Sequence, residues 1–78
     1  MKLKVTQRHI DKGIPNNHCF CPIALACQDA GMLFPEVSFW NIVDRDRVYL
    51  TGLKTLKFIS DFDRGKKVKP FSLWMIPL

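Results

Sequence analysis

The segment 37–51 constrains the fold of this chain more than any other. Two runs rich in β-branched and aromatic residues, 37–43 and 47–51, flank a polar Asp-Arg-Asp turn at 44–46. Such residues favour strands, and a connection of this length joins antiparallel neighbours. The segment therefore predicts a β-hairpin, against which the rest of the chain has to pack.

Helical patterns lie on both sides of this hairpin. Apolar residues recur at helical spacing over 23–30 and 53–62, which predicts two amphipathic helices. Pro22 suits the first turn of the earlier helix, with Cys21 as its N-cap. Glycines follow both segments, at positions 31 and 65, and are expected to end the helices.

Both ends of the chain have the period-two pattern of strands. Apolar and polar residues alternate over 2–6. In a second run, 71–76, which lies between two prolines, Phe71, Leu73 and Met75 alternate with Ser72, Trp74 and Ile76. Thr6 can cap a short helix over 7–12, and Gly13 is expected in the left-handed conformation that ends this helix.

The predicted order is β-α-α-β-β-α-β, which is typical of an α+β fold. We expect a small, largely antiparallel four-stranded sheet with helices packed on one face. The chain has 78 residues and room for one core, so residues 1–78 should form a single compact domain. The pattern leaves the order of the strands open, and an exposed sheet edge would allow a homodimer.

The chain is basic, with 12 Lys and Arg against 7 Asp and Glu and a formal net charge of +5. This balance is common in small soluble domains and is also compatible with polyanionic partners. The densest basic patch lies around residues 54–69 and contains Lys54, Lys57, Arg64, Lys66, Lys67 and Lys69. Nucleic-acid binding through this patch is the alternative function, although RNP, KH and zinc-finger signatures are absent.

Three cysteines lie close together, an odd number that favours a reducing compartment over a disulfide framework. With two histidines they give one candidate metal or redox cluster, made of His9, His18, Cys19, Cys21 and Cys27. The Cys-x-Cys spacing fits structural zinc poorly, so neither a metal nor a cofactor is predicted, and the redox alternative stays open. Cys21, at a helix N-terminus, is expected to be the most reactive thiol.

No motif in the chain predicts catalysis. Walker, dinucleotide-binding, HExxH and nucleophile-elbow patterns are all absent, so the sequence favours a protein that is not an enzyme. The N-terminus lacks the apolar region of a signal peptide, and no apolar run is long enough to cross a bilayer. An intracellular protein without membrane contacts is expected.

Three short motifs together resemble a group of small uncharacterised proteins encoded by bacteriophages and prophages. They are Val-Thr-Gln-x-His-Ile-Asp-x-Gly from Val5, Cys-Pro-Ile-Ala-Leu-Ala from Cys21, and Phe-Asp-x-Gly-x-x-Val-x-Pro-Phe-Ser from Phe62. The resemblance implies a phage or mobile-element gene expressed in the host bacterial cytoplasm. It implies no activity.

These observations favour a small accessory protein that binds and modulates a host or defence-system protein without catalysing a reaction. Exposed aromatic side chains commonly anchor such interfaces, and surrounding charges steer the encounter. The candidate partner-binding residues are Trp40, Tyr49 and Trp74, with Lys66, Lys67 and Lys69 as an electrostatic rim.

Overall fold

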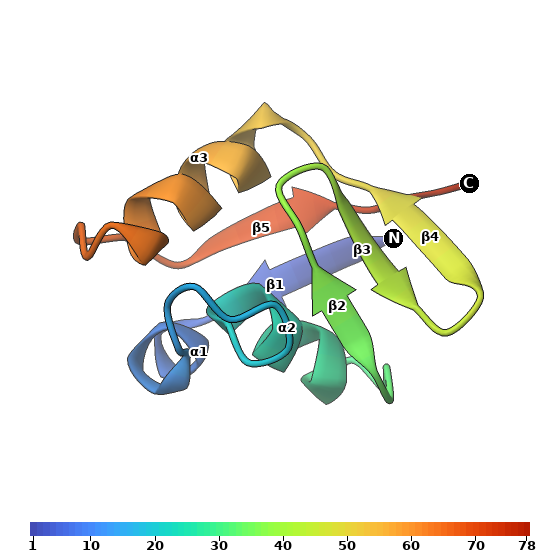
Figure 1. Ribbon diagram of the computed structural model, residues 1–78, viewed down its shortest axis with the longest axis horizontal. Helices are drawn as coiled ribbons and strands as arrows, with labels where there is room; N and C mark the ends of the chain where they lie inside the picture. Colours follow the sequence, from blue (N-terminus) through green and yellow to red (C-terminus); the bar gives the residue numbers. More distant parts are fainter.

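The first strand and the fifth strand of the chain lie side by side near the middle of the fold (Figure 1). In the computed structural model, which describes residues 1–78, β1 (Lys2–Val5) pairs antiparallel with β5 (Phe71–Trp74). Leu3 lies opposite Leu73, and both side chains are buried. The strand patterns predicted for the two ends therefore belong to one β-ribbon.

A second sheet is built from four short strands. These are β2 (Pro35–Val37), β3 (Asn41–Asp44), β4 (Arg47–Leu50) and β6 (Ile76–Pro77), in the order β2-β3-β4-β6 with every pair antiparallel. Only Met75 separates β5 from β6. The C-terminal segment thus connects the two sheets, pairing first with β1 and then with β4.

Three helices complete the fold: α1 (Gln7–Lys12), α2 (Pro22–Asp29) and α3 (Leu53–Asp63). α2 contacts α1, β1 and β2, whereas α3 runs beside β5 on the side away from β1 (Figure 1). None of the three is both long and apolar enough to traverse a lipid bilayer.

A capping box ties α1 to α2. The Thr6 side chain caps α1, and the Thr6 backbone N–H donates to Nδ1 of His9 at 2.9 Å. Because Nδ1 accepts, Nε2 carries the proton and donates to the carboxylate of Asp29 at 2.6 Å. This bond, together with the Arg8 guanidinium 2.8 Å from the same oxygen, lowers the pKa of Asp29.

The predicted α+β class is confirmed, and so are the caps at Thr6 and Cys21. The predicted hairpin is the β3–β4 pair, in which Arg45 takes a positive φ of 59° in the turn. Gly31 and Gly65, with φ of 101° and 77°, follow α2 and α3 as expected. The core residues come mainly from both sheets and from α2, with Ile23, Ile42 and Met75 almost fully buried, and α3 adds Phe58.

Two of the predicted strands are each divided, so the sheet is not the single four-stranded one expected. The run 37–43 is interrupted at 38–40, where the Ser38 hydroxyl donates to Oδ1 of Asn41 at 2.6 Å and stabilises a turn. The run 71–76 is divided at Met75, where the strand changes partner. The predicted element order is otherwise retained.

The prediction for Gly13 is wrong. Its φ is −68°, an ordinary value for any residue, so the left-handed conformation does not explain this glycine. A Cβ atom built there would lie 2.5 Å from Cδ of Pro22, the first residue of α2. Gly13 is therefore required by a close approach between the end of α1 and the start of α2.

Gly13→Ala should lower the free energy of unfolding by about 1–3 kcal/mol, since the added methyl group overpacks against a rigid proline ring. Gly52→Ala is the matched control, because no atom lies within 4 Å of its Cβ position, and it should change stability by less than about 1 kcal/mol. Urea unfolding followed by circular dichroism measures both. Equal effects of the two substitutions would contradict the steric account.

Candidate functional site

The C-terminal segment exposes a line of large apolar side chains. Trp74 and Ile76 are 66% and 62% exposed, and Leu78 is exposed as well, whereas the intervening Leu73 and Met75 are buried. Successive side chains of a strand point to opposite faces. The segment therefore presents one apolar face to the core and a second apolar face to solvent.

The neighbouring strands extend the solvent-facing side. Leu50 of β4 lies opposite Ile76, and Val48 of β4 lies opposite Val43 of β3. Cross-strand partners share a face, and these residues alternate with the buried pair Ile42 and Tyr49. The outer apolar face, as we call this surface, consists of Val43, Val48, Leu50, Trp74, Ile76 and Leu78.

Lysine side chains border this face. Lys2 lies opposite Trp74 in the β1–β5 ribbon, and its Nζ is 5.9 Å from the centroid of the indole ring. This distance allows a cation–π contact that orients the ring. Leu53, at the exposed start of α3, continues the apolar surface towards Lys54.

Two grooves lie between α3 and the C-terminal segment and share Lys54. The first has a volume of about 520 Å³ and is lined among others by Leu53, Ser72 and Trp74. The second has a volume of about 460 Å³ and is lined by Phe58, Asp61, Val68, Pro70 and Phe71 together with four lysines, Lys54, Lys57, Lys67 and Lys69. Apolar and basic surfaces therefore meet along one side of α3.

The structure brings together only part of the predicted interface. Trp74 lies on the outer apolar face, and Lys67 and Lys69 line the basic groove. Trp40 is 57% exposed but lies in the turn between β2 and β3, outside both grooves. Lys66 does not line either groove, although its Nζ lies 3.9 Å from Asp61, which lines the second.

Tyr49 does not belong to the interface. Only 9% of its surface is exposed, because it lies opposite Ile42 on the core side of the β3–β4 pair. Ile76, Leu50 and Leu53 were missing from the predicted interface. Their apolar character was visible in the sequence, but nothing in it indicated that they face solvent.

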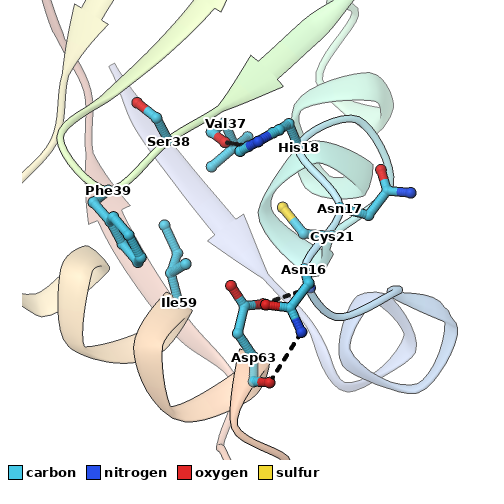
Figure 2. Close-up of a pocket in the computed structure, with 9 residues that line it drawn as sticks. All are labelled: Asn16, Asn17, His18, Cys21, Val37, Ser38, Phe39, Ile59 and Asp63. Atoms are coloured by element: carbon cyan, nitrogen blue, oxygen red, sulfur yellow. Dashed lines mark hydrogen bonds between the residues drawn. The ribbon is translucent and has the colours of Figure 1, made fainter.

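A separate pocket of about 290 Å³ lies between the 16–21 loop, the end of β2 and α3 (Figure 2). Asn16 takes a positive φ of 57°, and its backbone N–H donates to Asp63 of α3 at 2.9 Å. His18 donates from Nδ1 to the carbonyl of Val37 at 3.1 Å. These bonds hold the loop against α3 and β2.

The Cys21 sulfur also lines this pocket and accepts a hydrogen bond from the Ala24 N–H at 3.4 Å. Burial nevertheless raises the pKa of the Cys21 thiol above its usual range. No hydrogen bond links it to His18 or Asp63. Without a base in contact, the thiol is not activated as a nucleophile.

The residues of the candidate metal or redox cluster are dispersed. His9 is bound to Asp29, His18 and Cys21 line the pocket, Cys19 is exposed and Cys27 is buried in the core. No group of three or more His, Cys, Asp or Glu side chains is placed to hold a metal ion.

Comparison of the chain with protein-family models, curated proteins and solved structures found no match. The candidate site therefore rests on the geometry described above.

The expectation that Cys21 is the most reactive thiol is corrected by its burial. Burial raises the pKa of Cys27 to about 12 and also raises that of Cys21, whereas Cys19 is exposed. At pH 8, iodoacetamide should alkylate Cys19 at least about tenfold faster than either buried thiol. In urea all three rates should converge. Tandem mass spectrometry resolves the sites, and equal native rates for Cys19 and Cys21 would contradict this assignment.

Proposed function

We propose that this chain is a protein-binding module that acts without catalysis, and that its interface is centred on Trp74 and Ile76. One observation carries the proposal: large apolar side chains form a continuous exposed face on a domain this small. Contiguous exposed apolar patches are typical of interaction sites, whereas single exposed apolar residues are common everywhere.

The composition of the surface fits a protein interface. Trp74 is a rigid aromatic anchor, and Leu50 and Ile76 are aliphatic neighbours paired across two strands. Binding energy in such interfaces is concentrated in a few aromatic and apolar residues near the centre. Lys2 and Lys54 lie at the border, where charges raise the association rate and favour acidic partners.

The partner we propose is a host or defence-system protein in the bacterial cytoplasm, whose activity is altered by the binding. This proposal rests on the resemblance of the three sequence motifs to small phage and prophage proteins. We propose no cofactor and no catalytic residue, since the buried Cys21 thiol is not activated.

Nucleic-acid binding is the second candidate, and the lysine-lined groove between α3 and β5 favours it. Lys54, Lys57, Lys67 and Lys69 lie along one groove, and the exposed Trp74 could stack on a base. Such binding would weaken steeply with added salt, because phosphate contacts release counterions. A largely apolar protein interface would be much less sensitive to salt.

The direct test is retention of partners from nuclease-treated bacterial lysate, followed by measurement of Kd for each retained protein. Trp74→Ala should weaken binding about tenfold or more, because truncation of a central aromatic anchor commonly costs about 2 kcal/mol. Ile76→Ser should act in the same direction. Trp40→Ala is the matched control, since it removes an exposed indole outside the outer apolar face, and it should change Kd less than about twofold.

Two results would contradict the proposed function. One is retention that disappears after nuclease treatment, which would favour the nucleic-acid alternative. The other is a partner whose Kd is unchanged by both Trp74→Ala and Ile76→Ser while circular dichroism shows the variants folded.

A further inference from the structure

β5 has a strand neighbour on one edge only. Its single partner is β1, and no strand lies on its other edge. Just beyond β5, the chain pairs with β4 on that other side through Ile76 and Leu50. β4 ends at Leu50, and the chain turns into α3 before it could continue alongside Trp74.

The register shows which main-chain groups face the open edge. Met1 and Met75 exchange two hydrogen bonds, of 2.7 and 3.0 Å. In an antiparallel pair, bonded and non-bonded positions alternate, so Leu73 and Phe71 also bond towards β1. The N–H and C=O groups of Ser72 and Trp74 therefore point away from β1, towards the open edge.

This edge is accessible. Ser72 and Trp74 both line the 520 Å³ groove beside the start of α3, so α3 borders the edge without filling it. Proteins commonly cover or blunt such edges, because an open edge is a template for another strand. Here Lys54 borders the edge, and Lys2 lines the same groove from β1, so that their charges select the strand that could occupy the edge.

The charge along the edge is mainly positive. Lys54, Lys57, Lys67 and Lys69 line the continuation of the groove, and Asp61 is its single carboxylate. The Asp61 carboxylate already forms salt bridges with Nζ of Lys57 at 3.3 Å and with Nζ of Lys66 at 3.9 Å. The uncompensated positive charge is complementary to acidic side chains.

We propose that the open edge of β5 binds an extended acidic segment of the partner protein as an additional strand. This inference rests on the proposed function and specifies its binding mode. Main-chain bonds to Ser72 and Trp74 hold the segment, in the manner of strand addition. Because strand side chains alternate, acidic residues facing α3 meet the lysines, while apolar residues extend the outer apolar face beside Trp74.

A peptide fits this edge better than a nucleic acid does. The edge offers carbonyl acceptors as well as N–H donors, and a phosphate backbone has no donors for the carbonyl groups of Ser72 and Trp74. An extended peptide supplies both at the spacing of a strand. The lysines alone would suit either ligand. The main-chain donors and acceptors of Ser72 and Trp74 are therefore the groups that favour a peptide over a nucleic acid.

The probe is the peptide acetyl-(Val-Glu)4-amide, titrated into the ¹⁵N-labelled chain and followed by NMR. We expect the Ser72 and Trp74 amide signals to shift and their hydrogen exchange to slow, with little change at Leu73. The control peptide acetyl-(Val-Lys)4-amide should bind at least tenfold more weakly. A third peptide, N-methylated at alternate residues, should lose binding because it lacks the required donors.

Ser72→Pro removes an N–H that faces the open edge and leaves the bonds to β1 in place, so it should weaken peptide binding at least tenfold. Ser72→Ala keeps that N–H and should bind within twofold of the original chain. Lys54→Gln combined with Lys67→Gln should weaken binding and reduce its salt dependence. If Ser72→Pro does not fold, the N-methylated peptide tests the same hydrogen bonds.

Several results would overturn the inference: equal binding of the acidic and basic peptides, equal binding of the N-methylated peptide, or unshifted Ser72 and Trp74 amides. A single-stranded oligothymidine that shifts these amides at lower concentration than the acidic peptide would also overturn it. Leu50→Ser distinguishes the proposed protein interface on the outer apolar face from the proposed strand addition at β5, because Leu50 lies on the outer apolar face but outside the open edge. It should weaken binding of the lysate partner and leave the peptide Kd unchanged.

Discussion

The C-terminal segment changes its strand partner at Met75: β5 pairs with β1 on one edge, and β6 pairs with β4 on the other edge. The rest of the structure depends on this change of partner. The Met75 N–H donates to Met1 at 2.7 Å, and the next residue, Ile76, pairs with Leu50 of β4. The Met75 side chain is almost fully buried in the hydrophobic core. One segment thereby joins the β1–β5 ribbon to the four-stranded sheet and completes a core that neither sheet has alone.

The same change of partner creates the surface that we propose for binding. Because the bonds of β5 go to β1 and those of β6 go to β4, Ser72 and Trp74 are left with unpaired main-chain groups. The segment is apolar on both faces, so the face that does not enter the core carries Trp74 and Ile76 into solvent. The open edge and the outer apolar face are two consequences of one connection, and they meet at Trp74.

The sequence predicted the elements well because their signals are local. The caps at Thr6 and Cys21, the hairpin turn and the helix predicted over 53–62 each depend on a few adjacent residues. Long-range features could not be predicted. Both faces of 71–76 are apolar, so alternation alone could not tell that Leu73 is buried and Trp74 exposed. The pairings of Lys2 with Trp74 and of His9 with Asp29 join residues far apart in the chain.

Amide hydrogen exchange of the free chain, resolved by NMR, tests the open edge of β5 most directly. Amides bonded within a core ladder exchange far more slowly than those open to water. We expect slow exchange at Leu73 and Met75 and fast exchange at Ser72 and Trp74. Strong protection at Ser72 and Trp74 in the free chain would contradict the account, because it would mean that this edge is already paired.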